Sequence, residues 1–138
     1  MRFDVLISKK DLHWIIEIPV LDVMTQGRTK KEAYEMLRDA VESLVGRTNF
    51  RAKIHVRKRG TEIFLTGNDQ DALIALLIRR QRQRHGLTLQ EVAKRLGSSS
   101  VNAIARYEHG SSRPTVAKLI ELLEAINPNL SPTIKLAA

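Results

Sequence analysis

The feature that most constrains this chain is a change in hydrophobic periodicity at Gly67-Asn68-Asp69. Before these residues, apolar and polar side chains alternate in short runs, as in half-buried β-strands. After them, apolar side chains recur every three to four residues, as in amphipathic helices. A chain of 138 residues can form two small domains. The pattern therefore predicts an α+β protein with one domain at residues 1–67 and an all-helical domain at residues 68–138.

The first half of the sequence contains five candidate strands and one candidate helix. The strands are expected at residues 3–7, 14–18, 20–27, 50–58 and 63–65. The segment 9–11 suits a hairpin turn, and Pro19 breaks the second strand or places it at an edge. The helix begins after Thr29, which forms a capping box with Glu32, and ends at Gly46. The order β-β-β-α-β-β predicts an antiparallel sheet with one helix across one face.

The second half contains four candidate helices, at about residues 70–85, 88–96, 100–108 and 115–126. Thr88 and Glu91 form a second capping box at the start of the second of these helices. Two short helices that cross closely need a small residue at their contact and a turn with a positive φ angle. Ala93 and Gly97 meet these two needs. This arrangement predicts a helix-turn-helix at roughly residues 69–127.

The helix at about 100–108 has one side for docking and one side for a ligand. Ile104 and Tyr107 are expected to face inward. The outward side is expected to carry Val101, Asn102, Ala105 and Arg106. A helix exposed in this way can enter the major groove of double-stranded DNA.

About forty consecutive residues resemble the Cro/lambda-repressor-like, or XRE, family of DNA-binding domains. The matching residues are Gly86-Leu87-Thr88, Val92-Ala93, Leu96-Gly97, Ile104, Arg106-Tyr107-Glu108, Gly110 and Pro114. Two departures stand out. Leu89 replaces a glutamine that is common in the family, and the turn Gly97-Ser98-Ser99-Ser100 is one residue longer than usual. The longer turn leaves open whether Val101 or Asn102 reaches the bases.

The resemblance implies a role for each matching position in DNA binding. Asn102 would pair with an adenine, Arg106 would donate to a guanine or a phosphate, and Val101 would touch a thymine methyl group. Contacts to phosphates, which position the protein without reading sequence, are implied for the remaining candidates. These candidates are Thr88, Gln90, Ser100, Ser111, Ser112 and Arg113.

The segment that precedes and opens the first helix resembles the signature of HicB-type antitoxins. The matching residues are Pro19-Val20-Leu21-Asp22-Val23, Gln26-Gly27, Thr29 and Glu32-Ala33. The resemblance implies a partial ribonuclease-H-like domain at residues 1–67 that binds and neutralises a HicA-type RNA-cleaving toxin. It also implies that the domain at 68–138 represses the protein's own operon by binding operator DNA. The alternative is an XRE-family transcriptional regulator whose N-terminal domain senses a small molecule.

Catalysis and metal binding are not expected from this sequence. The absence of cysteine excludes disulfides, thiolate zinc sites and cysteine nucleophiles. Nuclease chemistry of the ribonuclease-H type needs clustered carboxylates, whereas the acidic residues here are scattered. The histidines show no ligand spacing. We therefore expect no enzyme activity and no cofactor, and the lack of a long apolar run predicts a cytoplasmic protein with no membrane partner.

The chain has a net charge of +8, which favours a polyanionic partner. Residues 1–66 and 67–138 each carry an excess of four positive charges, so charge alone does not assign the partner to either half. Residues 51, 53, 55 and 57 form a basic strand face, for which simple solvation is favoured over a nucleic-acid role. The tail at 131–136 alternates like a strand and is expected to pair with its twin in at least a dimer.

Overall fold

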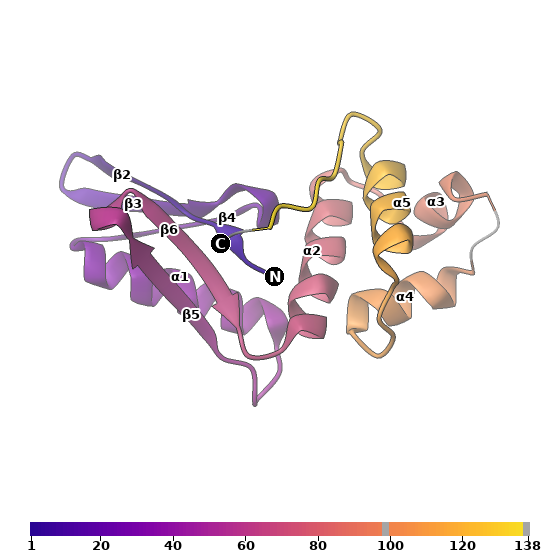
Figure 1. Ribbon diagram of the computed structural model, residues 1–138, viewed down its shortest axis with the longest axis horizontal. Helices are drawn as coiled ribbons and strands as arrows, with labels where there is room; N and C mark the ends of the chain where they lie inside the picture. Colours follow the sequence, from indigo (N-terminus) through magenta and orange to yellow (C-terminus); the bar gives the residue numbers. More distant parts are fainter. Residues whose placement is uncertain (98–99, 137–138) are drawn as a thin grey trace. The chain divides into compact units, whose positions relative to one another are not determined.

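The computed structural model describes residues 1–97 and 100–136 (Figure 1). The elements of the first half are β1 (Phe3–Asp4), β2 (Leu6–Lys10), β3 (His13–Ile18), η1 (Pro19–Leu21), β4 (Val23–Gly27), α1 (Lys30–Val45), β5 (Ala52–Arg57), η2 (Lys58–Gly60) and β6 (Glu62–Gly67). The elements of the second half are α2 (Gln70–Arg84), α3 (Leu89–Arg95), α4 (Val101–His109) and α5 (Val116–Ile126). The predicted α+β class is confirmed, with antiparallel strands and one helix followed by helices alone.

The strands form two three-stranded antiparallel sheets rather than the one sheet that was predicted. The orders are β1-β6-β5 and β2-β3-β4. The first predicted strand passes from one sheet to the other at Val5, whose N–H donates to the carbonyl of Ile63 at 2.9 Å. The next residue, Leu6, already pairs with Glu17 of β3. Strands that change sheet at a bend are a known way to fold a sheet over its own core.

The helix α1 contacts both sheets and joins them into one core. It packs against β4 and β3 of one sheet and β5 of the other. The Thr29 side chain accepts from the Glu32 N–H at 3.1 Å, as the capping signal predicts. The Glu32 carboxylate, however, accepts from the Arg28 N–H at 2.7 Å, so the reciprocal half of the box lies one residue earlier. Ala33, Leu37 and Val41 are its buried residues.

The segment 20–27 is only partly the strand that was predicted. Pro19–Leu21 forms one turn of 3-10 helix, and Asp22 adopts a left-handed conformation with a φ angle of 51°. Proline at the start of this turn lacks the N–H that a strand would use. The strand β4 therefore begins at Val23 and pairs with β3 only from there.

The chain divides into two compact units, Met1–Leu77 and Ile78–Ala138. The predicted boundary after residue 67 marks the start of α2, and the division between the compact units falls within that helix. Asp69 caps α2, because its carboxylate accepts from the Ala72 N–H at 3.0 Å. We call these parts the N-terminal unit and the C-terminal unit.

In the C-terminal unit, α3 packs against α4 and α5. The core of this unit is aliphatic. Its buried apolar residues are Ile78, Val92, Ala93, Ile104, Leu122, Leu123 and Ile126. Ile104 is buried as predicted, but Tyr107 is only half-buried, and the neighbouring Glu108 is the residue that turns inward.

The segment 131–136 that follows α5 has no regular secondary structure in the single chain, and it leaves Ile134 and Leu136 exposed. None of the helices formed by the described residues has the length and apolar character that a bilayer crossing requires.

Candidate nucleic-acid interface

The helix α4 presents two distinct faces. Ile104 and Glu108 lie one turn apart and are both buried. Asn102 and Arg106 lie one turn apart on the other side and are both exposed, and His109 continues this exposed stripe. Val101 and Ala105 are half-buried between the two faces. Of the four residues predicted to face outward, Asn102 and Arg106 are exposed, Val101 and Ala105 are only half-buried, and the exposed His109 was not among those predicted.

The start of α4 is set by Ser100. Its hydroxyl oxygen accepts from the Asn102 N–H at 3.2 Å, which makes Ser100 the N-cap of the helix. Gly97 precedes it with a φ angle of 82°, the positive value expected for the turn. The predicted extra residue of this turn falls at Ser98 and Ser99, which lie outside the described residues.

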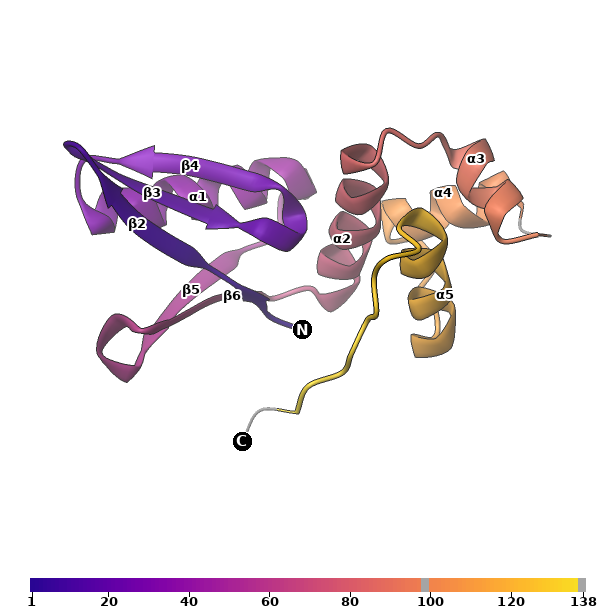
Figure 2. The same ribbon diagram turned by 90° about the horizontal axis from the view of Figure 1, so that it is seen from above.

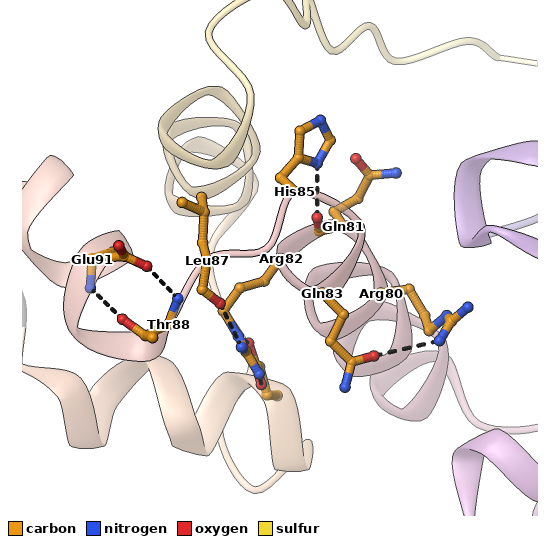
Figure 3. Close-up of polar contacts among 9 residues, drawn as sticks. Arg80, Gln81, Arg82, Gln83, His85, Leu87, Thr88 and Glu91 are labelled. Carbon is orange, nitrogen blue, oxygen red and sulfur yellow. Dashed lines mark hydrogen bonds and ion pairs between the residues drawn. The ribbon is translucent and has the colours of Figure 1, made fainter.

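The start of α3 carries the predicted capping box (Figure 3). The Glu91 N–H donates to the Thr88 hydroxyl oxygen at 3.1 Å, and the Thr88 N–H donates to the Glu91 carboxylate at 2.7 Å. This second bond is the main reason that the pKa of Glu91 is lowered, so the carboxylate stays charged. The backbone N–H of Thr88 is therefore engaged within the protein, and its hydroxyl proton is the donor left for a phosphate. Gln90 lies exposed in the same turn.

The loop after α4 contains the remaining predicted phosphate contacts. The carbonyl of Arg106 accepts from both the backbone N–H of Ser111, at 3.1 Å, and its hydroxyl, at 3.3 Å. Ser111 is exposed, Ser112 is half-buried and Arg113 is exposed. The structure therefore brings Ser111 to the C-terminal end of the helix that carries Arg106.

An ion pair between the half-buried Arg82 and the buried Glu108 ties α4 to the end of α2. The Arg82 Nε and Nη2 atoms donate to the two carboxylate oxygens of Glu108 at 2.5 and 2.9 Å. The Arg82 Nη1 atom donates to the Leu87 carbonyl at 2.8 Å, in the loop before α3 (Figure 3). The hydrogen bonds to Glu108 raise the pKa of Arg82. Three segments of the C-terminal unit are thus joined by one guanidinium group, which holds α4 in place.

A second arginine joins α3 to α5. The Arg95 Nη1 atom donates to the carbonyls of Ala125 and Ile126 at 3.0 and 3.2 Å. These are among the last carbonyls of α5, which have no partner within the helix. The Arg95 side chain therefore caps a neighbouring helix.

Charge is unevenly divided between the two compact units. Residues 1–77 hold 13 lysines and arginines against 11 acidic residues, and residues 78–138 hold 10 against 4. The C-terminal unit therefore carries +6 of the net charge of +8. The even division seen in the sequence arose because Asp69 and Asp71, at the start of α2, were counted with the second half. The excess of positive charge favours DNA as the partner of the C-terminal unit.

Residues 78–130 match the family described as helix-turn-helix, of the XRE type. The match starts at the first residue of the C-terminal unit. The C-terminal unit therefore contains a helix-turn-helix, which supports a role in DNA binding. The comparison with curated proteins gave no match. In the described part of the chain, no three histidine or acidic side chains lie close enough together to hold a metal ion.

Proposed function

We propose that this protein is an antitoxin that represses its own operon and neutralises a HicA-type RNA-cleaving toxin. The C-terminal unit would insert α4 into the major groove of the operator. The observation that carries this part is the exposed stripe of Asn102 and Arg106 on a helix whose opposite face is held by Ile104 and the ion pair of Glu108. A rigid helix with polar side chains on its free side is suited to reading base edges.

The proposed contacts divide into base readout and phosphate positioning. Asn102 would pair bidentately with an adenine, Arg106 would donate to a guanine or a phosphate, and Val101 would touch a thymine methyl group. The phosphate contacts would come from side chains around the start of α3 and the two ends of α4. These are Thr88, Gln90, Ser100, Ser111, Ser112 and Arg113.

The test of the DNA-binding part uses the DNA upstream of the protein's own gene. In fluorescence anisotropy, Asn102→Ala should weaken binding by about 1–3 kcal/mol and relax sequence preference at one position. Asn129→Ala is the matched control, because Asn129 is exposed and follows α5. The proposal fails if both variants bind like the original protein, or if the original protein does not prefer this DNA over a shuffled duplex.

The N-terminal unit would bind the toxin. Of the residues that resemble the antitoxin signature, Gly27 lies against the backbone of Ala33 where β4 leads into α1, and Pro19–Leu21 forms η1 before β4. On the outer face of the β2-β3-β4 sheet, Leu6 and Met24 are 54% and 65% exposed and lie on either side of Glu17. Exposed apolar side chains aligned across a sheet favour a protein partner.

The cavities described in the N-terminal unit give less support to the alternative, a regulator that senses a small molecule. One lies between α1 and β5, has a volume of about 230 Å³, and is lined in part by Glu35, Arg38 and Lys53. Ligand sites are usually larger, about 300–1,000 Å³, and mainly apolar. The other has a volume of about 390 Å³, within that range, but its lining includes the charged residues Asp39, Glu42 and Arg47 and is not mainly apolar.

The test of the toxin-binding part is co-expression with the small protein encoded beside this gene. We expect a complex that survives gel filtration and an arrest of growth by the neighbour alone, which this protein relieves. Met24→Asp should weaken the complex, whereas Gln26→Asp, on the same strand and exposed, should weaken it less. Absence of a complex with the original protein would refute this half and leave the DNA-binding half standing.

We also propose that the protein acts as at least a dimer. The exposed side chains of Ile134 and Leu136 alternate in the segment after α5, as the residues of an unpaired strand would. Pairing of this segment with its twin would match the two half-sites of a palindromic operator. Light scattering should give a dimer mass for the full chain and a monomer mass for a chain that ends at residue 130. A monomeric full chain would contradict the proposal.

A further inference from the structure

The outer face of the β5-β6 hairpin carries a row of basic side chains. Residues 53, 55 and 57 alternate to the same side of β5, opposite Thr66, Phe64 and Glu62 of β6. The row continues into the turn of the hairpin with Lys58 and Arg59. Arg2, which precedes β1, reaches the same face. We call Arg2, Lys53, Arg57, Lys58 and Arg59 the hairpin patch.

The ring of Phe64 organises the centre of this face. The guanidinium carbon atoms of Arg2 and Arg57 lie 4.5 and 5.2 Å from the ring centroid. The His55 ring stacks on the same ring with centroids 4.8 Å apart and an interplanar angle of 14°. These contacts restrict the two guanidinium groups before any ligand arrives, so less conformational entropy is lost when they bind one.

The positive charge of the hairpin patch is only partly neutralised. Glu62 pairs with both Arg2, at 3.3 Å, and Lys58, at 3.7 Å. Among residues 1–97 and 100–136, no carboxylate pairs with Lys53, Arg57 or Arg59. The pKa of His55 is lowered, first by burial and then by Lys53 and Arg57, as a surplus of positive charge at this face requires.

The turn of the hairpin holds two of these cations in an unfavourable backbone conformation. Lys58 and Arg59 have φ angles of 51° and 54°, a region that glycine and asparagine occupy at lower cost. Residues kept in such conformations are concentrated at functional sites. The turn also stands apart from the β2-β3-β4 sheet, which leaves it accessible within the N-terminal unit (Figure 2).

We propose that the hairpin patch is a second nucleic-acid contact surface, which binds the phosphate backbone without reading bases. Arginine and lysine side chains in a row can follow consecutive phosphates of one strand. Phe64 is only 4% exposed beneath the cations, so no aromatic surface is offered for base stacking. The ligand chemistry is a sugar–phosphate backbone, which duplex DNA and single-stranded RNA share. The surface is independent of α4 and does not depend on the operator proposal.

The first test removes three charges that have no acidic partner, in Lys53→Gln, Arg57→Gln and Arg59→Gln combined. Anisotropy is measured against a random-sequence duplex and a single-stranded RNA over a range of salt concentrations. The slope of log affinity against log salt should become shallower by about 3 for the duplex or about 2 for the RNA. Affinity should fall about tenfold or more at about 0.1 M salt. The probe whose salt slope changes, the duplex DNA or the single-stranded RNA, identifies the nucleic acid that the hairpin patch binds.

The matched control combines Lys10→Gln, Arg28→Gln and Lys31→Gln, which removes the same charge from exposed positions elsewhere in the N-terminal unit. It should leave the slopes nearly unchanged. Equal changes of slope in the two triple variants would show that only net charge matters. An unchanged slope for the hairpin variant with both probes would show that the hairpin patch does not bind phosphates. Either result overturns the proposal.

The second test uses the strain in the turn. Lys58→Asn with Arg59→Gly should raise the Tm, because both new residues tolerate a positive φ angle, and should weaken nucleic-acid binding at the same time. A raised Tm with unchanged binding would overturn the proposal. The ratio of operator to random-duplex affinity should stay constant in this variant, whereas Asn102→Ala should lower that ratio. Failure of one proposal is thus separable from failure of the other.

Discussion

In the N-terminal unit, two glycines lie where a Cβ atom would collide with other atoms, whereas in the C-terminal unit Gly97 has open space around it. A Cβ on Gly27 would meet the backbone nitrogen of Ala33 and lie 2.9 Å from its Cα atom. A Cβ on Gly67 would lie 2.6 Å from the Phe50 ring. Gly97 has a φ angle of 82° and nothing within 4 Å. In the N-terminal unit glycine is needed because there is no room for a Cβ atom, and in the C-terminal unit it is needed because the turn requires a positive φ angle.

The two units also differ in how they use charge. In the N-terminal unit, the side chains of the Arg47–Asp69 pair are 36% and 35% exposed. In the C-terminal unit, Arg82 and Glu108 are 17% and 7% exposed. All of the chain's phenylalanine and tryptophan lies in the N-terminal unit, so the C-terminal unit buries smaller, aliphatic side chains. The first unit depends on close apolar fit, and the second on a smaller core together with a buried ion pair.

The largest effect is expected from Glu108→Ala, which leaves the guanidinium of Arg82, only 17% exposed, without its partner. Loss of one member of a buried pair costs about 3–5 kcal/mol. Urea unfolding followed by far-UV circular dichroism should show this loss. Fluorescence of Trp14, the chain's one tryptophan, reports on the N-terminal unit and should change little.

A double variant separates the energy of the pair from the cost of an unpaired charge. Arg82→Met with Glu108→Leu should cost less than Glu108→Ala alone, since apolar side chains of similar volume often replace a buried pair without loss. If Glu108→Ala costs under about 1 kcal/mol, the pair contributes no more than a surface ion pair, and the contrast between the units is wrong.

The next largest effect is expected from Gly27→Ala in the N-terminal unit. Because the atoms that a Cβ would meet belong to the backbone of Ala33 and Glu32, α1 must shift away from β4. We expect a loss of about 3 kcal/mol, at the upper end for overpacked cores. Trp14 fluorescence during urea unfolding measures it.

Gly67→Ala is the comparison for this prediction. Its Cβ would meet side-chain atoms of Phe50 and Leu73, which can adjust more easily than a helix backbone. We expect a smaller loss, about 2 kcal/mol. Equal stability of Gly27→Ala and the original protein would contradict the account of close approach at the β4–α1 junction.

A smaller effect is expected from Gly97→Ala in the C-terminal unit, about 1–2 kcal/mol for a Cβ in the left-handed region. Gly97→Asn should cost less, because asparagine tolerates this conformation. Both values come from circular dichroism during urea unfolding. If asparagine costs as much as alanine, the positive φ angle is not what requires glycine at this turn, and the contrast between the two units is wrong.

Much of the fold could be predicted because its signals are local. The caps at Thr29 and Thr88 need only a few neighbouring residues, and each side chain accepts the backbone bond that was expected. The division into two sheets could not be predicted. Apolar residues alternate without interruption through Val5, so the sequence carries no sign that the strand changes partners there.

As with the fold, the sequence predicted the local part of the candidate site and not its long-range contacts. Asn102 and Arg106 lie on one exposed face because helical spacing fixes their relation to buried Ile104. The role of Arg82 could not be foreseen, since a run of basic residues at the end of a helix looks like a solvated surface. Its partner is the carboxylate of Glu108, 26 residues further along the chain, and no local sequence pattern indicates this pairing.

The smallest effect concerns pH and the carboxylate of Asp69 at the start of α2. The hydrogen bond from the Ala72 N–H, together with Arg47 at 2.7 Å, holds the pKa of Asp69 below its ordinary value of 3.8. A carboxylate with a lowered pKa in the folded state adds stability above its unfolded pKa, and this stability is lost as the pH falls through the folded value. Asp69→Asn keeps a cap but loses the charge, so it should cost about 1 kcal/mol or less at neutral pH. Urea unfolding followed by Trp14 fluorescence should show that this cost shrinks below about pH 4. The cost of Gly27→Ala should not vary with pH. If the cost of Asp69→Asn is also constant with pH, the charge of Asp69 does not stabilise the start of α2.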